Sequence, residues 1–195
     1  MCVRRAVATR GPVRRAPLSA RPPVLACRPA DREWFNAKAI SKGGTGPPFV
    51  DYAYKDAALA HVAGLLAAAA PPFDGLFGFS QGGSLAAWVA ALQQRGELSP
   101  PSAAPLRFVW LQSARAPRDP SCEGLFSPPL ATPCFVAYNE DDTAVTPHET
   151  RALLAHLAAP TVVHRESGGH APMSVQRRPA DGEALRAWLQ RFRTG

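Results

Sequence analysis

The stretch "FDGLFGFSQGG", residues 73–83, decides the fold prediction. An apolar run leads into a Gly-x-Ser-x-Gly pattern centred on Ser80, and the alanine-rich run "SLAAWVAAL" follows directly. This order predicts a short buried strand, a sharp turn and then a helix that ends near Gly96. A serine on such a turn is held above the edge of the sheet, as in a nucleophile elbow. We therefore predict that Ser80 is a catalytic nucleophile, and the alternative is a glycine-rich connection with an unreactive serine.

The neighbours of Ser80 have predicted roles of their own. Gly78 and Gly82 allow backbone segments to pass close to the turn. The backbone N–H of Gln81 opens the following helix, and N–H groups at a helix N-terminus stabilise a developing oxyanion. Gln81 is therefore the predicted oxyanion residue. The side chains expected to pack in the core, without contacting substrate, are Leu76, Phe77, Phe79 and Trp88.

Strands and helices alternate along the rest of the chain. Helices are predicted over residues 52–70, 147–158 and 181–193, and strands over residues 106–113, 133–140 and 161–167. This alternation predicts an α/β fold in which a mostly parallel sheet carries helices on both faces. The segment "SKGGTGPPF", residues 41–49, lacks the Gly-Lys-Ser/Thr ending of a phosphate loop and is expected to be a flexible loop.

A nucleophilic serine requires a histidine base and a carboxylate that orients it, in the chain order Ser, acid, His for this fold. The predicted strand at 133–140 is followed by three acidic residues, of which Asp142 is the predicted acid. Glu140 and Asp141 are interpreted as solvated loop charges. The base is predicted to be His170, which follows two glycines in "ESGGHAPM".

The other four histidines are interpreted as packing or surface residues, with His164 half-buried in a strand: His61, His148, His156 and His164. The segment "HETR", residues 148–151, lacks the second histidine of a zinc-binding His-Glu-x-x-His helix, so no metal role is expected. The four cysteines contain no Cys-x-x-Cys pair, which favours free thiols in a reducing compartment, although a disulfide between distant members stays open.

Three segments together resemble the FSH serine hydrolases, a family of small α/β-hydrolase esterases: "PPFDGLFGFSQGG" (71–83), "NEDDTAV" (139–145) and "HRESGGHAP" (164–172). The resemblance covers roughly residues 24–192. It implies an α/β-hydrolase fold and hydrolysis of carboxylic esters, often with an alkyl or acyl chain, without a cofactor or a metal. Carried over to this sequence, it makes Ser80 the nucleophile, Asp142 the acid and His170 the base.

The resemblance does not extend to the N-terminal part of the chain. Family members begin with a strand that ends in a His-Gly loop, which supplies a second oxyanion amide, and this sequence contains no His-Gly dipeptide. The segment "PPVLACRPADREWF", residues 22–35, is similar to a later strand of the family and the aromatic stretch after it. We therefore expect an N-terminally truncated α/β-hydrolase domain over residues 24–195. The alternative to an active esterase is an impaired or truncated member that acts, if at all, as a binding protein.

The formal charge of +7 is concentrated at the N-terminus. Residues 1–30 hold seven of the 22 basic residues and no acid, and the remaining 15 basic residues equal the 15 acidic ones. The body therefore lacks the basic stripe of a nucleic-acid-binding protein. A basic-tail interaction protein that uses these arginines for an acidic partner is a third hypothesis.

The basic leader, residues 1–23, is expected not to pack. A cytoplasmic protein is predicted, with an organelle as the alternative if residues 1–30 are a transit peptide. No run approaches the roughly 18 apolar residues of a membrane span. The expected partner is a small-molecule ester.

Overall fold

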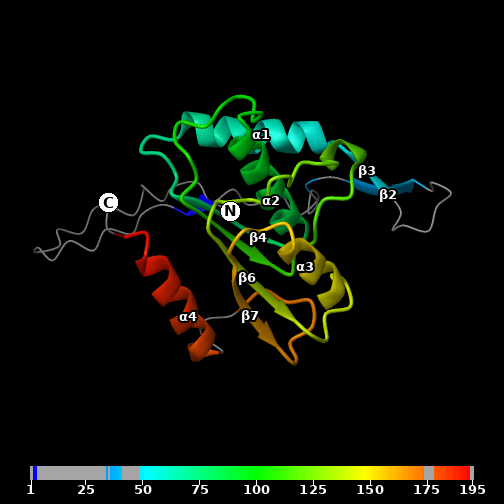
Figure 1. Ribbon diagram of the computed structural model, residues 1–195, viewed down its shortest axis with the longest axis vertical. Helices are drawn as coiled ribbons and strands as arrows, with labels where there is room; N and C mark the ends of the chain where they lie inside the picture. Colours follow the sequence, from blue (N-terminus) through cyan, green and yellow to red (C-terminus); the bar gives the residue numbers. More distant parts are fainter. Residues whose placement is uncertain (1, 4–33, 35, 41–48, 174–177, 194–195) are drawn as a thin grey trace, which may run out of the picture.

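The computed structural model describes residues 2–3, 34, 36–40, 49–173 and 178–193 (Figure 1). The elements, in chain order, are β1 (Cys2–Val3), β2 (Asn36–Ile40), β3 (Phe49–Ala53), α1 (Lys55–Ala68), β4 (Gly75–Phe79), α2 (Gln81–Arg95), β5 (Phe108–Gln112), the 3₁₀ turn η1 (Pro120–Cys122), β6 (Cys134–Asn139), α3 (Pro147–Leu154), β7 (Thr161–Arg165) and α4 (Pro179–Gln190). Each strand and helix predicted between residues 73 and 193 is present, with ends that differ by a few residues.

The main sheet has the strand order β1-β4-β5-β6-β7. The four strands β4 to β7 are parallel, and β1 pairs antiparallel with the start of β4. Parallel strands end at the same edge of a sheet, so the loops after β4, β5, β6 and β7 meet there. The predicted α/β fold with a mostly parallel sheet is confirmed.

Helices cover both faces of this sheet (Figure 1). Residues of α1, α2 and α3 share one buried cluster with Leu76, Val109 and Val136 of the sheet. On the other face, Leu185 and Trp188 of α4 pack with Phe108, Phe135 and Ala137 in a second cluster. The neighbouring strand residues alternate between the two clusters because side chains along a strand point to opposite faces.

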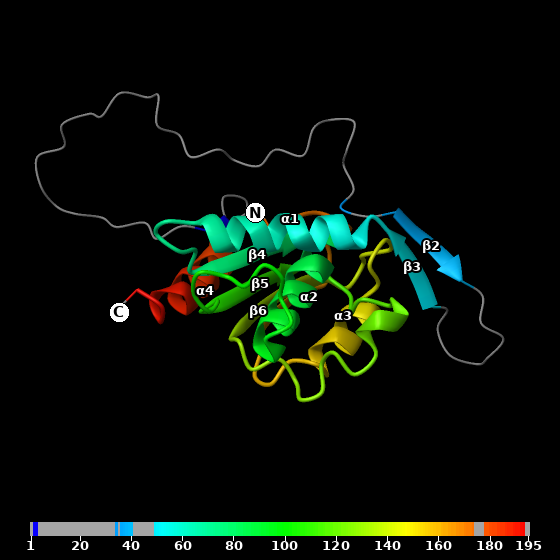
Figure 2. The ribbon, with the colours of Figure 1, turned by 90° about the horizontal axis from the view of Figure 1, so that it is seen from above.

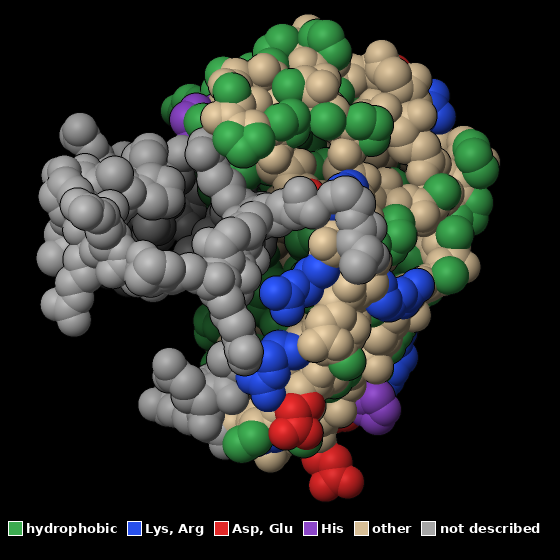
Figure 3. All heavy atoms as spheres, turned by 90° about the vertical axis from the view of Figure 1, so that its left-hand side faces the viewer, with side chains coloured by type: hydrophobic (Ala, Val, Ile, Leu, Met, Phe, Trp, Pro, Cys, Tyr) green, Lys and Arg blue, Asp and Glu red, His purple; other side chains and the backbone are tan. Residues whose placement is uncertain are grey.

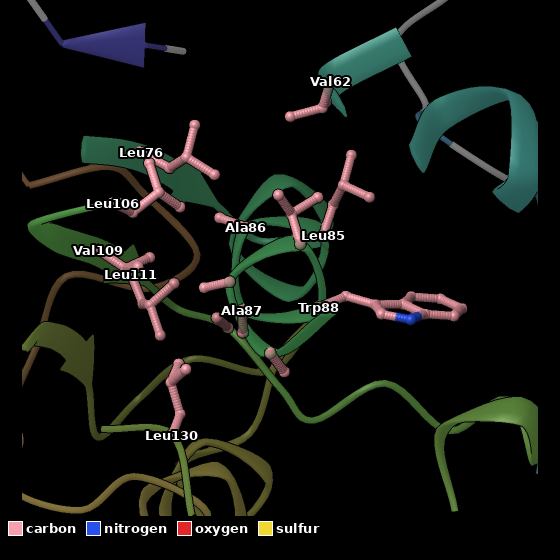
Figure 4. Packing of buried hydrophobic residues seen from close by; sticks show 14 of the residues in the cluster. Val62, Leu76, Leu85, Ala86, Ala87, Trp88, Leu106, Val109, Leu111 and Leu130 are labelled. Atoms are coloured by element: carbon pink, nitrogen blue, oxygen red, sulfur yellow. The ribbon is translucent and has the colours of Figure 1, made fainter. Parts of the chain in front are cut away.

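Helix α2 is buried through its whole middle, from Gly83 to Ala91, so the nucleophile turn is mounted on a rigid element. Figure 4 shows Ala86 and Ala87 of this helix turned toward Val109 and Leu111 of the sheet, with Trp88 pointing away from them. Trp88 and Leu76 are core residues, as predicted. The helix ends at Gly96, which has the left-handed φ of 71° that favours glycine.

The predicted helix at 52–70 is wrong at its start. Tyr52 and Ala53 belong to β3, which pairs antiparallel with β2, and the helix begins only at Lys55. Tyr54 has a left-handed φ of 68°, which separates the strand from the helix. Figure 2 shows this β2-β3 hairpin beside the N-terminal end of α1, apart from the main sheet. The hairpin was missed because its ladder is set by pairing with residues 36–40, which the sequence pattern around Tyr52 does not show.

Two leader residues pair with the main sheet, although the leader, residues 1–23, was expected not to pack. Cys2 pairs with Leu76 and Val3 pairs with Gly75, because the edge strand β4 offers unpaired N–H and C=O groups there. The rest of the leader lies outside the described residues, as do most of the segment at 22–35 that is similar to a family strand and residues 41–48 of the expected loop. The division into a leader and a domain over 24–195 stays a prediction.

The described surface carries both signs of charge. In Figure 3, Lys and Arg side chains gather across the middle of the face, and Asp and Glu side chains lie nearer its lower end. Within the described part of the chain, no helix is long and apolar enough to cross a membrane. The described cysteines Cys122 and Cys134 are buried free thiols, and burial raises the pKa of each to about 12.

Candidate active site

Ser80 sits in a strained turn between β4 and α2. Its φ of 54° and ψ of −123° lie outside the regions that L-residues prefer. The turn is fixed by the Ser80 N–H, which donates to the Gln112 carbonyl at 2.8 Å, and by the Gly83 and Ser84 N–H groups, which donate to the Ser80 carbonyl. A strained residue held by several hydrogen bonds at the end of a strand is the geometry predicted for a nucleophile elbow.

Glycines make this turn possible. A Cβ on Gly78 would lie 2.1 Å from the Gly82 carbonyl oxygen, so no side chain fits at Gly78. A Cβ on Gly83 would lie 2.6 Å from the Cβ of Ala114. Gly82 is less restricted, because its nearest neighbour would be the Trp34 indole nitrogen at 3.3 Å. The close approach was thus predicted at Gly78, whereas the strict requirement at Gly83 was missed.

The predicted base His170 lies within hydrogen-bond distance of both the predicted nucleophile Ser80 and the predicted acid Asp142. His170 Nε2 is 2.9 Å from Ser80 Oγ, and His170 Nδ1 is 2.9 Å and 3.1 Å from the two carboxylate oxygens of Asp142. A carboxylate only accepts hydrogen bonds, so Nδ1 carries the proton and Nε2 of the neutral ring accepts from the serine hydroxyl. This orientation leaves His170 able to take the serine proton.

Asp142 is held in a fixed position below the histidine. Its side chain is fully buried, and one oxygen accepts the N–H groups of Ala144 at 2.9 Å and Val145 at 3.0 Å. Burial raises the pKa of this carboxyl, but the hydrogen bonds from His170, Val145, Ser113 and Ala144 outweigh burial and lower it below the ordinary value. Asp142 is therefore ionised at neutral pH, as an orienting carboxylate must be.

Ser113 is a site residue that the sequence reasoning missed. It follows β5, is almost completely buried and has a left-handed φ of 42°. Its N–H donates to the Ala137 carbonyl at 2.8 Å, and its side chain bonds Asp142. No pattern in "LQSARAP" distinguishes this serine from an ordinary loop serine. Its role can be recognised only from the structure, where β5 and β6 are neighbours and Ser113 lies beside Asp142.

Phe79 was predicted only to pack in the core, but it also contacts His170. Its ring centroid lies 4.7 Å from that of His170, so the last residue of β4 supports the imidazole of the base. Phe77 packs on Trp110 with a centroid distance of 4.4 Å, as expected for a core strand residue. The alternating positions 77 and 79 thus share one face of the sheet but have different neighbours.

The other two acidic residues of the 139–142 segment also have polar partners, although Glu140 is half-buried and Asp141 is exposed. Glu140 forms an ion pair with Arg151 at 2.5 Å. Asp141 accepts the backbone N–H groups of Gly168 and Gly169, the two residues that precede His170. Asp141 is exposed, in line with its interpretation as a solvated loop charge, but its contacts with Gly168 and Gly169 were not predicted.

The remaining histidines have other neighbours than the nucleophile. His61 lies beside Trp34 and His156 stacks on Phe126. His164 was predicted to be half-buried, but its side chain is 62% exposed and lies 3.5 Å from Glu140, because it points outward from the edge strand β7. His148 is exposed near the start of α3.

Gln81 begins α2 directly after the nucleophile, where the first N–H groups of a helix point out of its N-terminus. Its side-chain oxygen accepts the backbone N–H of Trp34 at 2.5 Å. On the edge of β4 opposite β5, the described residues provide only the two-residue strand β1. The neighbourhood of the predicted oxyanion residue is therefore less extensively paired, within the described residues, than the side that carries Asp142 and His170.

A profile of the serine hydrolase (FSH1) family matches residues 20–178, which is most of the chain and includes Ser80, Asp142 and His170. The chain belongs to the FSH1 serine hydrolase family. The resemblance drawn from the segments at 71–83, 139–145 and 164–172 is thereby confirmed.

Curated relatives agree with this assignment. Esterase OVCA2 of Mus musculus is 38% identical over 111 residues, covering 56% of this chain and 47% of the relative. Esterase OVCA2 of Homo sapiens is 39% identical over 101 residues, covering 51% and 42%. The matched regions thus span somewhat less than half the length of these relatives.

The acyl-protein thioesterase 2 structure of Zea mays has a TM-score of 0.57 at 21% identity, covering 81% of this chain and 71% of that one. The Arabidopsis thaliana SOBER1 F65L structure has a TM-score of 0.55 at 17% identity, covering 83% and 74%. At these identities the likeness shows the fold alone.

Proposed function

We propose that this protein hydrolyses carboxylic esters of alkyl or acyl chains through an acyl-enzyme on Ser80. The observation that carries the proposal is the unbroken line of hydrogen bonds from Ser80 Oγ through both ring nitrogens of His170 to the Asp142 carboxylate, with 2.9 Å at each step. Membership of a serine hydrolase family supports the same chemistry. The substrate is a small-molecule ester.

In the first half of the reaction, Ser80 Oγ attacks the ester carbonyl carbon while His170 Nε2 takes the serine proton. Asp142 accepts the Nδ1 proton in a hydrogen bond and stabilises the imidazolium that forms. The tetrahedral intermediate collapses, the C–O bond to the alcohol breaks, and His170 gives its proton to the leaving oxygen. The acyl group is then bonded to Ser80.

In the second half, water attacks the acyl carbon and gives one proton to His170. The bond to Ser80 Oγ breaks, the carboxylic acid leaves, and the serine regains its proton from His170. The negative charge on the carbonyl oxygen in both halves is stabilised by the backbone N–H of Gln81 at the start of α2.

A second candidate is a family member that binds esters or another ligand with little or no turnover. It is favoured by the lack of a His-Gly dipeptide and by the short pairing of β4 with Cys2 and Val3, within the described residues, on the side away from β5. Loss of one oxyanion donor lowers turnover about 100- to 1000-fold. The two candidates therefore differ in the reactivity of Ser80.

Intact-mass measurement of the full 195-residue chain after exposure to a fluorophosphonate separates these candidates. The hydrolase proposal expects one adduct on the wild-type protein and none on Ser80→Ala. Circular dichroism of both proteins controls for folding. A folded wild-type chain that takes up no label would contradict the hydrolase proposal and leave the binding protein.

We also propose the cytoplasm as the compartment, with an organelle as the alternative if residues 1–30 are a transit peptide. The buried free thiols Cys122 and Cys134 suit a reducing compartment. Imaging of the chain with a C-terminal fluorescent tag, with and without residues 1–30, tests this: a change of compartment on deletion favours the organelle. Binding of an acidic partner that survives the same deletion would contradict the basic-tail hypothesis.

A further inference from the structure

The loop that carries His170, residues 166–173 and here called the histidine loop, is tied to the sheet on both sides of the histidine. Before His170, the Gly168 and Gly169 N–H groups donate to Asp141 at 3.0 Å and 2.7 Å. After it, the Met173 N–H donates to the Gln112 side-chain oxygen at 2.9 Å. These acceptors follow or end the strands β6 and β5, so the sheet itself locates the loop.

The glycine side of the loop is shaped for this attachment. Gly168 and Gly169 have φ values of 151° and 58°, which lie in the region that favours glycine. A Cβ on Gly168 would lie 2.8 Å from the Asn139 side-chain nitrogen, and that nitrogen donates to the Gly169 carbonyl at 2.7 Å. The backbone is therefore pressed against the end of β6. In this conformation two successive N–H groups converge on one carboxylate.

Two buried amide side chains bond the histidine loop from the sheet. Gln112 is 2% exposed and Asn139 is 3% exposed. Gln112 is paired in register with Ala137, and Asn139 is two residues farther along β6, so both amides lie on the same face of the sheet. Asp141 differs from both, because it is exposed and supplies the charged contacts of the loop.

We propose that Asp141 is a positioning residue: its carboxylate fixes Gly168 and Gly169 and thereby keeps the His170 ring in line between Ser80 and Asp142. This role rests on the proposed hydrolase function and differs from that of Asp142, which bonds the ring directly. The two adjacent carboxylates have different roles: Asp142 orients the imidazole, and Asp141 orients the backbone that carries it. Hydrogen bonds from Gly168 and Gly169 also lower the pKa of Asp141, as expected for a carboxylate that accepts two N–H groups.

Glu140 provides the matched control. It is the neighbouring acid and is paired with Arg151 of α3. Its described interactions do not include Gly168 or Gly169. Glu140→Gln removes the same charge one residue away from Asp141. Because Asp141 is exposed, its substitution leaves the buried clusters on both faces of the sheet intact.

The test compares wild type, Asp141→Ala, Asp141→Asn, Asp141→Glu and Glu140→Gln in the full chain, with a short-chain p-nitrophenyl ester as the probe. Misplacement of a reacting group by about 1 Å lowers turnover about 100-fold, so we expect kcat of Asp141→Ala to fall between about 10- and 100-fold with KM within about twofold. Asp141→Asn is expected to fall almost as far, because its NH₂ group faces one of the two glycine N–H donors. Asp141→Glu is expected to recover part of the activity, and Glu140→Gln to retain it.

Two further readouts do not depend on turnover. The amides of Gly168 and Gly169 are expected to exchange with solvent faster in Asp141→Ala than in wild type, at an unchanged Tm. The NMR signal of the His170 Nδ1 proton, which is hydrogen-bonded to Asp142, is expected to weaken in the same variant. A wild-type kcat in Asp141→Ala, or a fall equalled by Glu140→Gln, would overturn the positioning role.

Failure of the proposed function gives a different pattern. In that case wild type neither hydrolyses the ester nor takes up a fluorophosphonate, and the positioning role is judged by the His170 Nδ1 signal alone. Loss of that signal in Asp141→Ala then supports the role, and an unchanged signal overturns it.

Discussion

The two sides of Ser80 differ in how they are built. On the side of β5 and β6, Asp142 is fully buried, accepts several hydrogen bonds and holds His170 against the nucleophile. On the other side, the described residues include the short strand β1 and, at the start of α2, the Trp34 N–H, which donates to the Gln81 side chain. Within the described residues, many contacts thus hold Asp142 and His170, the proposed proton-transfer half of the site, and those around Gln81, the proposed oxyanion half, include the bond to Trp34.

This difference shows what each half requires. Proton transfer needs three side chains in line, and a parallel sheet brings the loops after its strands to one edge. Oxyanion stabilisation needs backbone N–H groups already aimed at a point in space, which only neighbouring main-chain segments supply. Substitutions at His170 or Asp142 perturb proton transfer, and a substitution at Gln81 perturbs the surroundings of the proposed oxyanion donor.

The largest effect is expected from the base. His170→Ala should lower kcat by roughly 10⁶-fold, because the serine hydroxyl loses the group that takes its proton. Ser80→Ala should cost about as much, and the double variant no more than either single one, since the residues act as a unit. Steady-state ester hydrolysis measures all three. Additive losses would contradict a shared mechanism.

The acid is next in size. Asp142→Asn should lower kcat by about 10⁴-fold, because an amide at this place favours the wrong tautomer of His170. Hydrolysis of the same ester by Asp142→Asn tests this, with Glu140→Gln as the control at a neighbouring acid. A loss below tenfold would show that another group orients the histidine.

The same variant has a stability signature. The pKa of Asp142 is lowered in the folded protein, so its ionised form stabilises the fold above its unfolded pKa, and this contribution is lost as the pH falls through the folded pKa. The difference in Tm between wild type and Asp142→Asn should therefore be largest near neutral pH and shrink under acid conditions. A difference that grows on acidification would contradict the direction of the shift.

The same contrast explains what the sequence could predict. The strand, turn and helix around Ser80 are contiguous and carry local signals, and the order of acid and base follows from the fold. The contacts of Ser113 and Asp141 were not predicted because they join residues 27 to 29 positions apart, across neighbouring loops. The β2-β3 hairpin was missed because Tyr52 alone carries no sign of its partner strand.

The turn itself supplies a further prediction, on stability. Gly78→Ala places a Cβ 2.1 Å from backbone that cannot move aside easily, and overpacking of this kind lowers the free energy of unfolding by about 1 to 3 kcal/mol. Gly64→Ala, in α1 with nothing within 4 Å of the added methyl, should instead raise it by about 0.5 to 1 kcal/mol. Thermal unfolding of the two variants measures both. Equal effects would show that the turn relaxes without penalty.

The smallest expected effect lies on the less paired side. Gln81→Ala keeps the backbone N–H that we propose as oxyanion donor but removes the acceptor of the Trp34 N–H, a hydrogen bond with a net value of about 1 kcal/mol. If that whole amount were lost from the transition state, fluorophosphonate labelling would slow about fivefold. The control is Gln94→Ala, because Gln94 lies near the other end of α2, where its side chain bonds the backbone of Pro129 and Ala131. That variant should label at the wild-type rate. A loss of 100-fold or more in Gln81→Ala would reach the size expected for a missing oxyanion donor, and it would place Trp34 and its surroundings within the oxyanion half of the site.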